Sequence, residues 1–320
     1  MADSPAAPDA DTVPLGGHDG RGAPVRAPSD EPPSARHEHV VVLQGARLTL
    51  GNAQHIGARE EQQDAFGFSD VADPDVLGHA GLLALVADGM GGGHDGGQAA
   101  RAASSAFIAA YEAKPADQPV PDALLDALDA ANRAVVAVRG ALEEGEVGTT
   151  LMAAVFLPGR LYWLSVGDSR AYLLRDGALT RLTHDHSVET DLFRQVVRGG
   201  LDREAALADP ERAYLTSYLG LDTVPAAYRT LRSFPLKDGD RLLLCSDGIY
   251  GALDEASLRT HLAGGAVADP EALVERIVGL ARPGQDNLTA VTVDYHGTAS
   301  PAGRAAADPQ TVAITPGRTP

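Results

Sequence analysis

The 320-residue sequence has a single cysteine, Cys245, so it contains no disulfide framework and no cysteine-based zinc site. It also lacks any run of 18 or more apolar residues, so we expect no membrane span. Basic residues are few, with 26 Lys and Arg against 44 Asp and Glu, giving a formal net charge of −18 at pH 7. This balance argues against nucleic acid and anionic membrane surfaces as partners. The N-terminus has no basic segment followed by an apolar one, so we expect no secretory signal and a soluble, cytoplasmic protein.

Two terminal segments differ in composition from the rest. Residues 1–38 and 297–320 are rich in Pro, Ala and Gly and poor in large apolar residues, which is typical of disordered chains. We therefore predict a disordered N-terminal arm, one ordered domain over residues 39–296 and a disordered C-terminal tail. Hydrophobic residues make up 44% of the chain, as in an ordinary globular domain.

Between these segments, β-prone runs alternate with segments of helical spacing. The predicted strands are Val40–Leu43, Leu82–Ala87, Thr150–Leu157, Leu161–Val166, Ala171–Leu174, Arg241–Cys245 and Leu288–Val293. The predicted helices are Gly97–Ala113, Ala123–Arg139, Val188–Arg198 and Pro270–Ala281. Pro158-Gly159 separates two of the β-prone runs, and Asp176-Gly177 follows another, so each indicates a hairpin. Hairpins followed by helices predict an antiparallel sheet with helices packed on it, an α+β fold.

Four stretches place an aspartate at or near the edge of a predicted strand. They are "GAREEQQDAFGF" with Asp64, "LLALVADGMGG" with Asp88, "DRLLLCSDGIY" with Asp247 and "GQDNLTAVTVDY" with Asp286. Each stretch alone is more typical of a turn. Together they indicate a metal site, because hard divalent cations need several oxygen ligands and clustered carboxylates repel one another without a cation.

The motifs resemble those of the metal-dependent protein phosphatases of the type-2C (PPM) serine/threonine family, in its bacterial form. The matching stretches run in family order over roughly residues 45–295; they are "AREEQQDAF", "LVADGMGGG", "VGTTLMAAVF", "LYWLSVGDSRAYLLRDGALTRLTHDHS", "DRLLLCSDGIY" and "GQDNLTAV". The resemblance implies a four-layer α-β-β-α sandwich in which helices flank two antiparallel sheets. It also implies a binuclear metal site at one edge of the β-sandwich and a flap over about residues 187–229.

The resemblance implies a role for each aspartate of the four stretches. Asp88 would bridge two Mn²⁺ or Mg²⁺ ions, and Asp247 and Asp286 would complete the protein ligands of the first. The second ion would take Asp88 and the carbonyl oxygen of Gly89. Asp64 would hold metal-bound water.

The resemblance also implies how the reaction proceeds. A hydroxide that bridges the two metals would attack phosphorus in line, while Arg59 binds the substrate phosphate. No protein nucleophile is needed, and we expect Cys245 to be a core residue. We therefore predict an enzyme that hydrolyses phosphoserine and phosphothreonine in proteins.

Several positions depart from the family pattern. Met90 stands where eukaryotic relatives have a histidine, so the general acid is unassigned. Glu144 and Glu146 are the candidates for a third metal ion, with a solvated loop as the alternative. We assign Asp168 to a turn rather than to a metal. Ser217 replaces an arginine that bacterial relatives usually carry in the flap.

The expected partners are phosphorylated Ser/Thr proteins and a cognate bacterial Ser/Thr kinase that the enzyme opposes; we expect a monomer. Two alternatives remain open. One is a pseudophosphatase that binds phosphoproteins without hydrolysing them. The other is a regulatory phosphatase of an anti-sigma pathway.

Overall fold

The computed structural model describes residues 39–91, 95–141, 147–265, 268–297 and 311–314. All of these residues belong to one unit, Glu38–Pro320. The predicted arm, residues 1–38, lies outside the described residues, so its disorder stays a prediction. Among the helices that the structure describes, none is long and apolar enough to cross a membrane.

The first sheet has six strands in the order β1-β2-β13-β12-β8-β9, and every neighbouring pair is antiparallel. These strands are β1 (His39–Leu43), β2 (Ala46–His55), β8 (Arg170–Arg175), β9 (Ala178–Arg181), β12 (Asp240–Cys245) and β13 (Leu288–His296). The pairing of β2 with β13 joins residues near the two ends of the ordered chain. It also places Leu288, at the start of β13, opposite His55, at the end of β2.

The second sheet has eight strands, with the main order β14-β10-β7-β6-β4-β3. Its strands are β3 (Asp64–Phe68), β4 (Leu82–Met90), β5 (Gly148–Thr149), β6 (Leu151–Leu157), β7 (Arg160–Val166), β10 (Ala227–Thr230), β11 (Phe234–Pro235) and β14 (Thr311–Ile314). β5 pairs with β4 and β11 pairs with β7, both antiparallel. The sequence did not indicate β14, which lies within the predicted C-terminal tail and pairs with β10.

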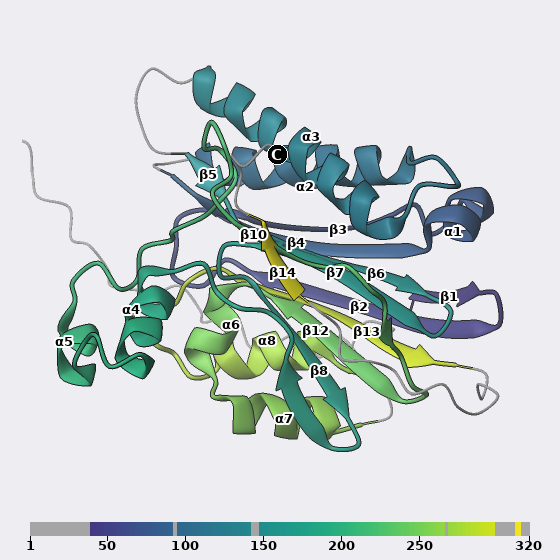
Figure 1. The fold of residues 1–320 in the computed structure, drawn as a ribbon. Helices are drawn as coiled ribbons and strands as arrows, with labels where there is room; N and C mark the ends of the chain where they lie inside the picture. The colour runs from purple at the N-terminus through teal and green to yellow at the C-terminus, as the bar shows by residue number, and fades with distance from the viewer. Residues whose placement is uncertain (1–38, 92–94, 142–146, 266–267, 298–310, 315–320) are drawn as a thin grey trace, which may run out of the picture. The chain divides into compact units, whose positions relative to one another are not determined.

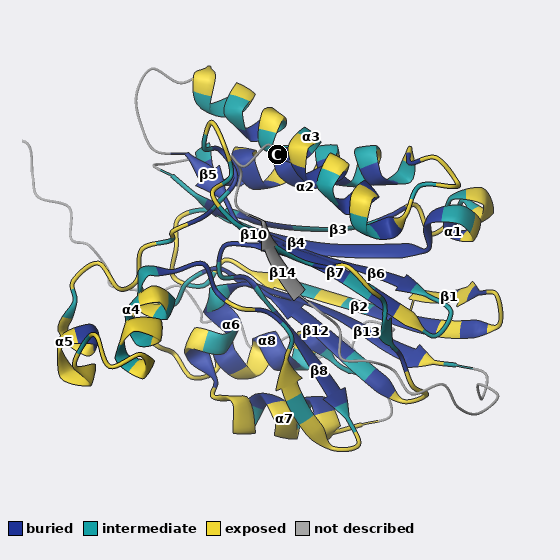
Figure 2. Cartoon of the chain, viewed as in Figure 1, coloured by how far each residue is buried: buried dark blue, intermediate teal, exposed yellow. Residues whose placement is uncertain are grey.

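Helices cover the outer faces of the two sheets (Figure 1). Helices α2 and α3 pack on the second sheet, and α6, α7 and α8 pack on the first. The helices are α1 (Pro74–Ala80), α2 (Asp95–Glu112), α3 (Val120–Gly140), α4 (Val188–Val197), α5 (Arg203–Ala208), α6 (Asp247–Ala252), α7 (Glu255–Ala263) and α8 (Pro270–Val278). Figure 2 shows buried strands between these helix layers. The predicted four-layer α-β-β-α sandwich is confirmed.

The periodicity of the sequence accounts for how the helices pack. In α3, residues Val120, Leu124, Ala127, Ala131 and Val135 recur every three or four positions, and all five are buried. This spacing places them on one face of a helix, and that face lies in the apolar cluster shared with the second sheet.

Both predicted hairpins are present. Leu157 pairs with Arg160 across Pro158-Gly159, and Arg175 pairs with Ala178 across Asp176-Gly177. Asp176 and Gly177 have φ values of 53° and 76°. A two-residue turn with positive φ at both positions matches the right-handed twist of the strands, which is why an Asp-Gly pair predicts it.

Helices α4 and α5 lie in the segment predicted as the flap (Figure 1). No residue of α4 is buried, although the helix is amphipathic, and Val197 at its end is 87% exposed. Ser217 is buried at the far end of the segment. Its hydroxyl donates to the carbonyl of Ala226 at 2.6 Å and accepts from the amide of Ala226 at 3.1 Å, which closes the loop before β10.

One buried ion pair fixes the first sheet and yields a prediction about stability. The Arg175 guanidinium donates to both carboxylate oxygens of Asp240, at 2.7 and 2.5 Å, and Asp240 is 1% exposed. The change Arg175→Ala would leave this carboxylate buried without its cationic partner. We therefore expect the free energy of unfolding to fall by about 3–5 kcal/mol. Chemical denaturation measures the effect. Arg160→Ala, at an exposed arginine on β7, is the control and should change stability by under about 0.5 kcal/mol; an equal loss in both variants would contradict the assignment.

Candidate active site

The four predicted aspartates lie at neighbouring strand and helix ends. Asp64 begins β3 and pairs with Asp88 on β4. Asp247 begins α6 directly after β12, and Asp286 lies just before β13. Because β12 and β13 are adjacent, with Cys245 opposite Ala290, the segments that carry Asp247 and Asp286 leave the first sheet side by side.

Asp64 joins the two sheets at this edge. It belongs to the second sheet, yet its carboxylate accepts hydrogen bonds from Ser246 Oγ and Thr289 Oγ1 of the first, both at 2.7 Å. The side chain is 5% exposed. These two hydroxyl groups hold Asp64 in place beside Asp88 and tie together the segments that carry the other two aspartates.

Asn287 positions the loop that carries Arg59. Its side-chain amide donates to the carbonyls of Ile56 and Glu61, and its carbonyl oxygen accepts from the amide of Gln63 at 2.7 Å. The sequence indicated Asn287 only as the residue before a strand. Its role depends on contacts with residues more than 200 positions away, which no local pattern reveals.

The glycines around Asp88 are required by close backbone packing. A Cβ at Gly89 would lie 2.1 Å from the carbonyl oxygen of Gly96 and 2.5 Å from that of Gln63. The Gly89 amide donates to the same Gln63 carbonyl at 3.2 Å. Glycine therefore lets the start of α2 lie directly against the end of β4.

The carboxylates are close enough to affect one another's ionisation. Burial raises the pKa of Asp88 well above its usual value, and repulsion from Asp64 and Asp247 raises it further. Burial is also the main cause that raises the pKa of Asp64 to about 6 and that of Asp247 to about 7. A buried group of like charges is unfavourable unless protons or a cation neutralise it.

Asp168, which we expected in a turn, also belongs to this group of charges. After burial, its charge is the largest electrostatic cause of the raised pKa of Asp247, and it also raises that of Asp88. Tyr250 Oη donates to its carboxylate at 3.1 Å. One signal was available: Asp168 follows β7 at the same end of the sheet as the others.

Arg59 lies at the rim of a cavity of about 560 Å³ whose lining includes Asp88, Gly89 and Asp286. Its guanidinium donates to Asp286 Oδ2 at 2.6 Å. Asp286 also borders an adjoining cavity of about 240 Å³ that Asp247 lines. The predicted phosphate anchor is therefore paired with a predicted metal ligand.

The oxygen atoms of this group are suitable ligands for a hard divalent cation, but their side chains do not converge on one point. Carboxylate and carbonyl oxygens are the ligands that Mg²⁺ and Mn²⁺ prefer. In the part of the chain that the structure describes, no three Asp, Glu, His or Cys side chains converge in the arrangement of a metal centre. The pairing of Asp286 with Arg59 occupies one of the oxygens that a cation would need.

The remaining residues singled out in the sequence that the structure describes do not belong to the aspartate group. Glu144 and Glu146 lie outside the described residues. Cys245 is buried inside β12, and burial raises its thiol pKa far above the usual range, as expected of a core cysteine. Met90 ends β4 and lines the larger cavity.

The family described as protein phosphatase 2C matches residues 52–275. The serine/threonine protein phosphatase PstP of Mycobacterium tuberculosis is 39% identical over 227 residues, which cover 68% of this chain and 41% of that protein. The chain thus spans about two fifths of the length of this relative. The serine/threonine phosphatase stp of Listeria innocua is 29% identical over 216 residues, covering 66% of this chain and 84% of that protein.

A solved structure adds a similarity of fold. The crystal structure of the catalytic domain of serine/threonine protein phosphatase PstP, in complex with two manganese ions, matches with a TM-score of 0.62 and 29% identity. The match covers 78% of this chain and 99% of that one. With the family match over most of the ordered region and carboxylates gathered at one edge of the sandwich, the chain belongs to the protein phosphatase 2C family.

Proposed function

We propose that this protein is a metal-dependent phosphatase that hydrolyses phosphoserine and phosphothreonine in proteins. The observation that carries the proposal is the group of carboxylates whose burial, together with mutual repulsion, raises their pKa values, beside an arginine that lines a cavity. Membership of the protein phosphatase 2C family supports the same reaction. No observation favours the binding-only alternative or the anti-sigma alternative.

Each residue has a defined task in this proposal. Asp88, Asp247 and Asp286, with the carbonyl of Gly89, would hold two Mn²⁺ or Mg²⁺ ions. When bound, such ions neutralise charge on the phosphoryl group and make water nucleophilic near neutral pH. Asp64, held by two hydroxyl groups, would accept a proton from water and orient it.

Arg59 would bind the phosphoryl oxygens. Its guanidinium is paired with Asp286 but remains 57% exposed, so it can turn to an incoming phosphate while Asp286 turns to a cation. Arginine presents two parallel N–H groups that match two phosphate oxygens.

A third cation is a separate question. The candidates Glu144 and Glu146 fall in the part of the chain that the structure leaves undescribed. An opposing Ser/Thr kinase, a cytoplasmic location and a monomeric state remain predictions.

Hydrolysis of p-nitrophenyl phosphate and of a phosphothreonine peptide tests the proposal. We expect both reactions to need Mn²⁺ or Mg²⁺ and to stop in EDTA. Full turnover after exhaustive chelation would refute the metal-dependent mechanism. Tight binding of the peptide without any turnover would favour the pseudophosphatase.

The raised pKa values predict how metal changes stability with pH. Asp64 and Asp247 bind protons more tightly in the folded than in the unfolded state, where an aspartate has a pKa of about 3.9. Their favourable contribution is complete below that pH and is lost as the pH rises through about 6 for Asp64 and about 7 for Asp247. We therefore expect the gain in melting temperature on adding Mn²⁺ to EDTA-treated protein to grow from about pH 5 to about pH 8.

Comparing the melting temperature with and without Mn²⁺ at each pH removes the effect of other titrating groups. Burial lowers the pKa of His186 to about 4, so this residue destabilises the folded protein in acid whether or not metal is present. A gain that stays constant across the pH range would mean that the carboxylate group does not take up the cation.

A further inference from the structure

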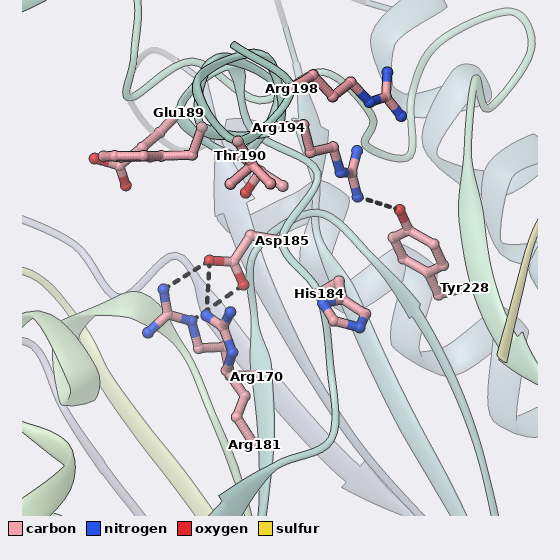
Figure 3. Close-up of a pocket in the computed structure, with 11 residues that line it drawn as sticks. Arg170, Arg181, His184, Asp185, Glu189, Thr190, Arg194, Arg198 and Tyr228 are labelled. Atoms are coloured by element: carbon pink, nitrogen blue, oxygen red, sulfur yellow. Dashed lines mark hydrogen bonds and ion pairs between the residues drawn. The ribbon is translucent and has the colours of Figure 1, made fainter. Parts of the chain in front are cut away.

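A third cavity, of about 700 Å³, lies beside helix α4 (Figure 3). Its lining shares no residue with either cavity at the aspartate group. Four arginines, Arg170, Arg181, Arg194 and Arg198, contribute to the lining, which we call the arginine pocket. Such a concentration of guanidinium groups is unusual in a chain with a net charge of −18 and indicates an anionic ligand.

The acidic side chains of the pocket do not balance these arginines. Asp185 accepts from Arg170 at 3.1 and 2.6 Å and also from Arg181 at 3.3 Å, so one carboxylate serves two guanidinium groups. Glu189 is the other acid in the lining. Four positive and two negative side chains leave a charge of about +2, close to the charge that neutralises a phosphoryl group near pH 7.

Helix α4 and its C-cap residue supply two exposed arginines. Arg194 and Arg198 are one helical turn apart, so they share one side of the helix. Arg194 donates to Tyr228 Oη at 2.7 Å and to the exposed Asp191 at 2.8 Å. The backbone amide of Arg198 donates to the carbonyl of Arg194 at 3.2 Å, whereas its guanidinium makes no hydrogen bond or ion pair within the described residues. Both guanidinium groups are exposed and therefore available to a ligand.

Apolar groups flank these charges. Phe193 and Val197 of α4 contribute to the lining, and Val197 is 87% exposed. Tyr228 stacks on the His186 ring at a centroid distance of 4.5 Å, which fixes the position of its hydroxyl. A cationic centre with an apolar margin suits a phosphorylated peptide better than a free ion.

A short series of contacts connects the arginine pocket to the aspartate group. The Arg170 guanidinium lies 3.5 Å above the Tyr250 ring, and Tyr250 donates to Asp168. Asp168 belongs to the aspartate group, so two side-chain contacts link the arginine pocket to that group.

We propose that the arginine pocket binds a second phosphoryl group of the phosphoprotein substrate, apart from the one that is hydrolysed. The proposal rests on the proposed phosphatase function and narrows its substrate class to multiply phosphorylated segments. The forked guanidinium groups of Arg194 and Arg198 provide paired donors for the phosphoryl oxygens.

A binding experiment tests the pocket without catalysis. A fluorescein-labelled phosphoserine hexapeptide is titrated into the full chain in EDTA and followed by anisotropy. We expect the double variant Arg194→Ala/Arg198→Ala to raise Kd at least about tenfold. Arg203→Ala, at an exposed arginine on α5, should bind like the parent. Equal binding by the double variant and the parent would overturn the proposal, as would equal binding of the unphosphorylated peptide. Inorganic phosphate that competes as tightly as the peptide would show a free-phosphate site instead.

A kinetic experiment then separates this proposal from the proposed function. With Mn²⁺, phosphothreonine peptides carrying a second phosphoserine about three, six or nine positions away are compared with singly phosphorylated peptides. We expect the double variant to raise KM about tenfold for the best doubly phosphorylated peptide and to leave p-nitrophenyl phosphate turnover unchanged. If neither the parent nor any variant hydrolyses any substrate, the proposed phosphatase function is wrong. The binding experiment then still shows whether the arginine pocket binds a phosphorylated peptide. If all hydrolyse and the double variant matches the parent on every peptide, the pocket proposal fails alone.

Discussion

Replacing Asp88 by asparagine is expected to lower kcat/KM for p-nitrophenyl phosphate by at least about 10³-fold. Asp88 is the proposed ligand of both cations, and removal of a single preorganised charge-stabilising group already costs about 10²–10³-fold in many enzymes. Calorimetric titration of the variant should show weakened Mn²⁺ binding.

The same change should leave the metal-free fold intact or stabilise it. Asparagine has nearly the same shape as aspartate, and the strand contacts of Asp88 use its backbone, which exchanges hydrogen bonds with Thr149 and Thr150. Loss of the charge also relieves the repulsion that raises the pKa of Asp88. We therefore expect an unchanged or higher melting temperature in EDTA.

Asp238→Asn provides the matched control, because Asp238 is 70% exposed and lies away from the aspartate group. It should retain parental activity and metal affinity. Activity of Asp88→Asn within about tenfold of the parent, or a collapse of its metal-free stability, would contradict the role assigned to Asp88.

The change Arg59→Ala is expected to lower kcat/KM for a phosphothreonine peptide by about ten- to a hundredfold. A charge-assisted hydrogen bond contributes about 1.5–3 kcal/mol, and the 57% exposure of Arg59 favours the lower end because solvent screens the interaction. The loss should appear mainly as weaker substrate and phosphate binding.

Metal binding should respond differently from activity in this variant. Removal of Arg59 frees Asp286 Oδ2 from its 2.6 Å ion pair, so Mn²⁺ affinity should stay the same or increase. Calorimetric Mn²⁺ titration, run beside Asp88→Asn, measures this. Loss of metal as complete as in Asp88→Asn, or parental turnover, would show that Arg59 is not the phosphate anchor.

Much of the fold follows from local patterns in the sequence. Each strand predicted from an apolar run is present, although β2, β3, β5, β10, β11 and β14 were not predicted. The Asp176-Gly177 turn was predictable because its positive φ values suit few other residue pairs. The short helix α6 was not predicted, because the Asp247-Gly248 pair that begins it also indicates a turn.

The sequence by itself determined the residue types of the site, the apolar faces of the longer helices and the hairpin turns, because all three depend on residues close together in the chain. Only the tertiary structure decided which charges meet. It brought Asp168 to the aspartate group, paired Arg59 with Asp286, and gathered four arginines around the arginine pocket. These arrangements depend on strand order and on the packing of α4, which bring together residues up to 227 positions apart, and chain-local propensities carry no information about such distant neighbours.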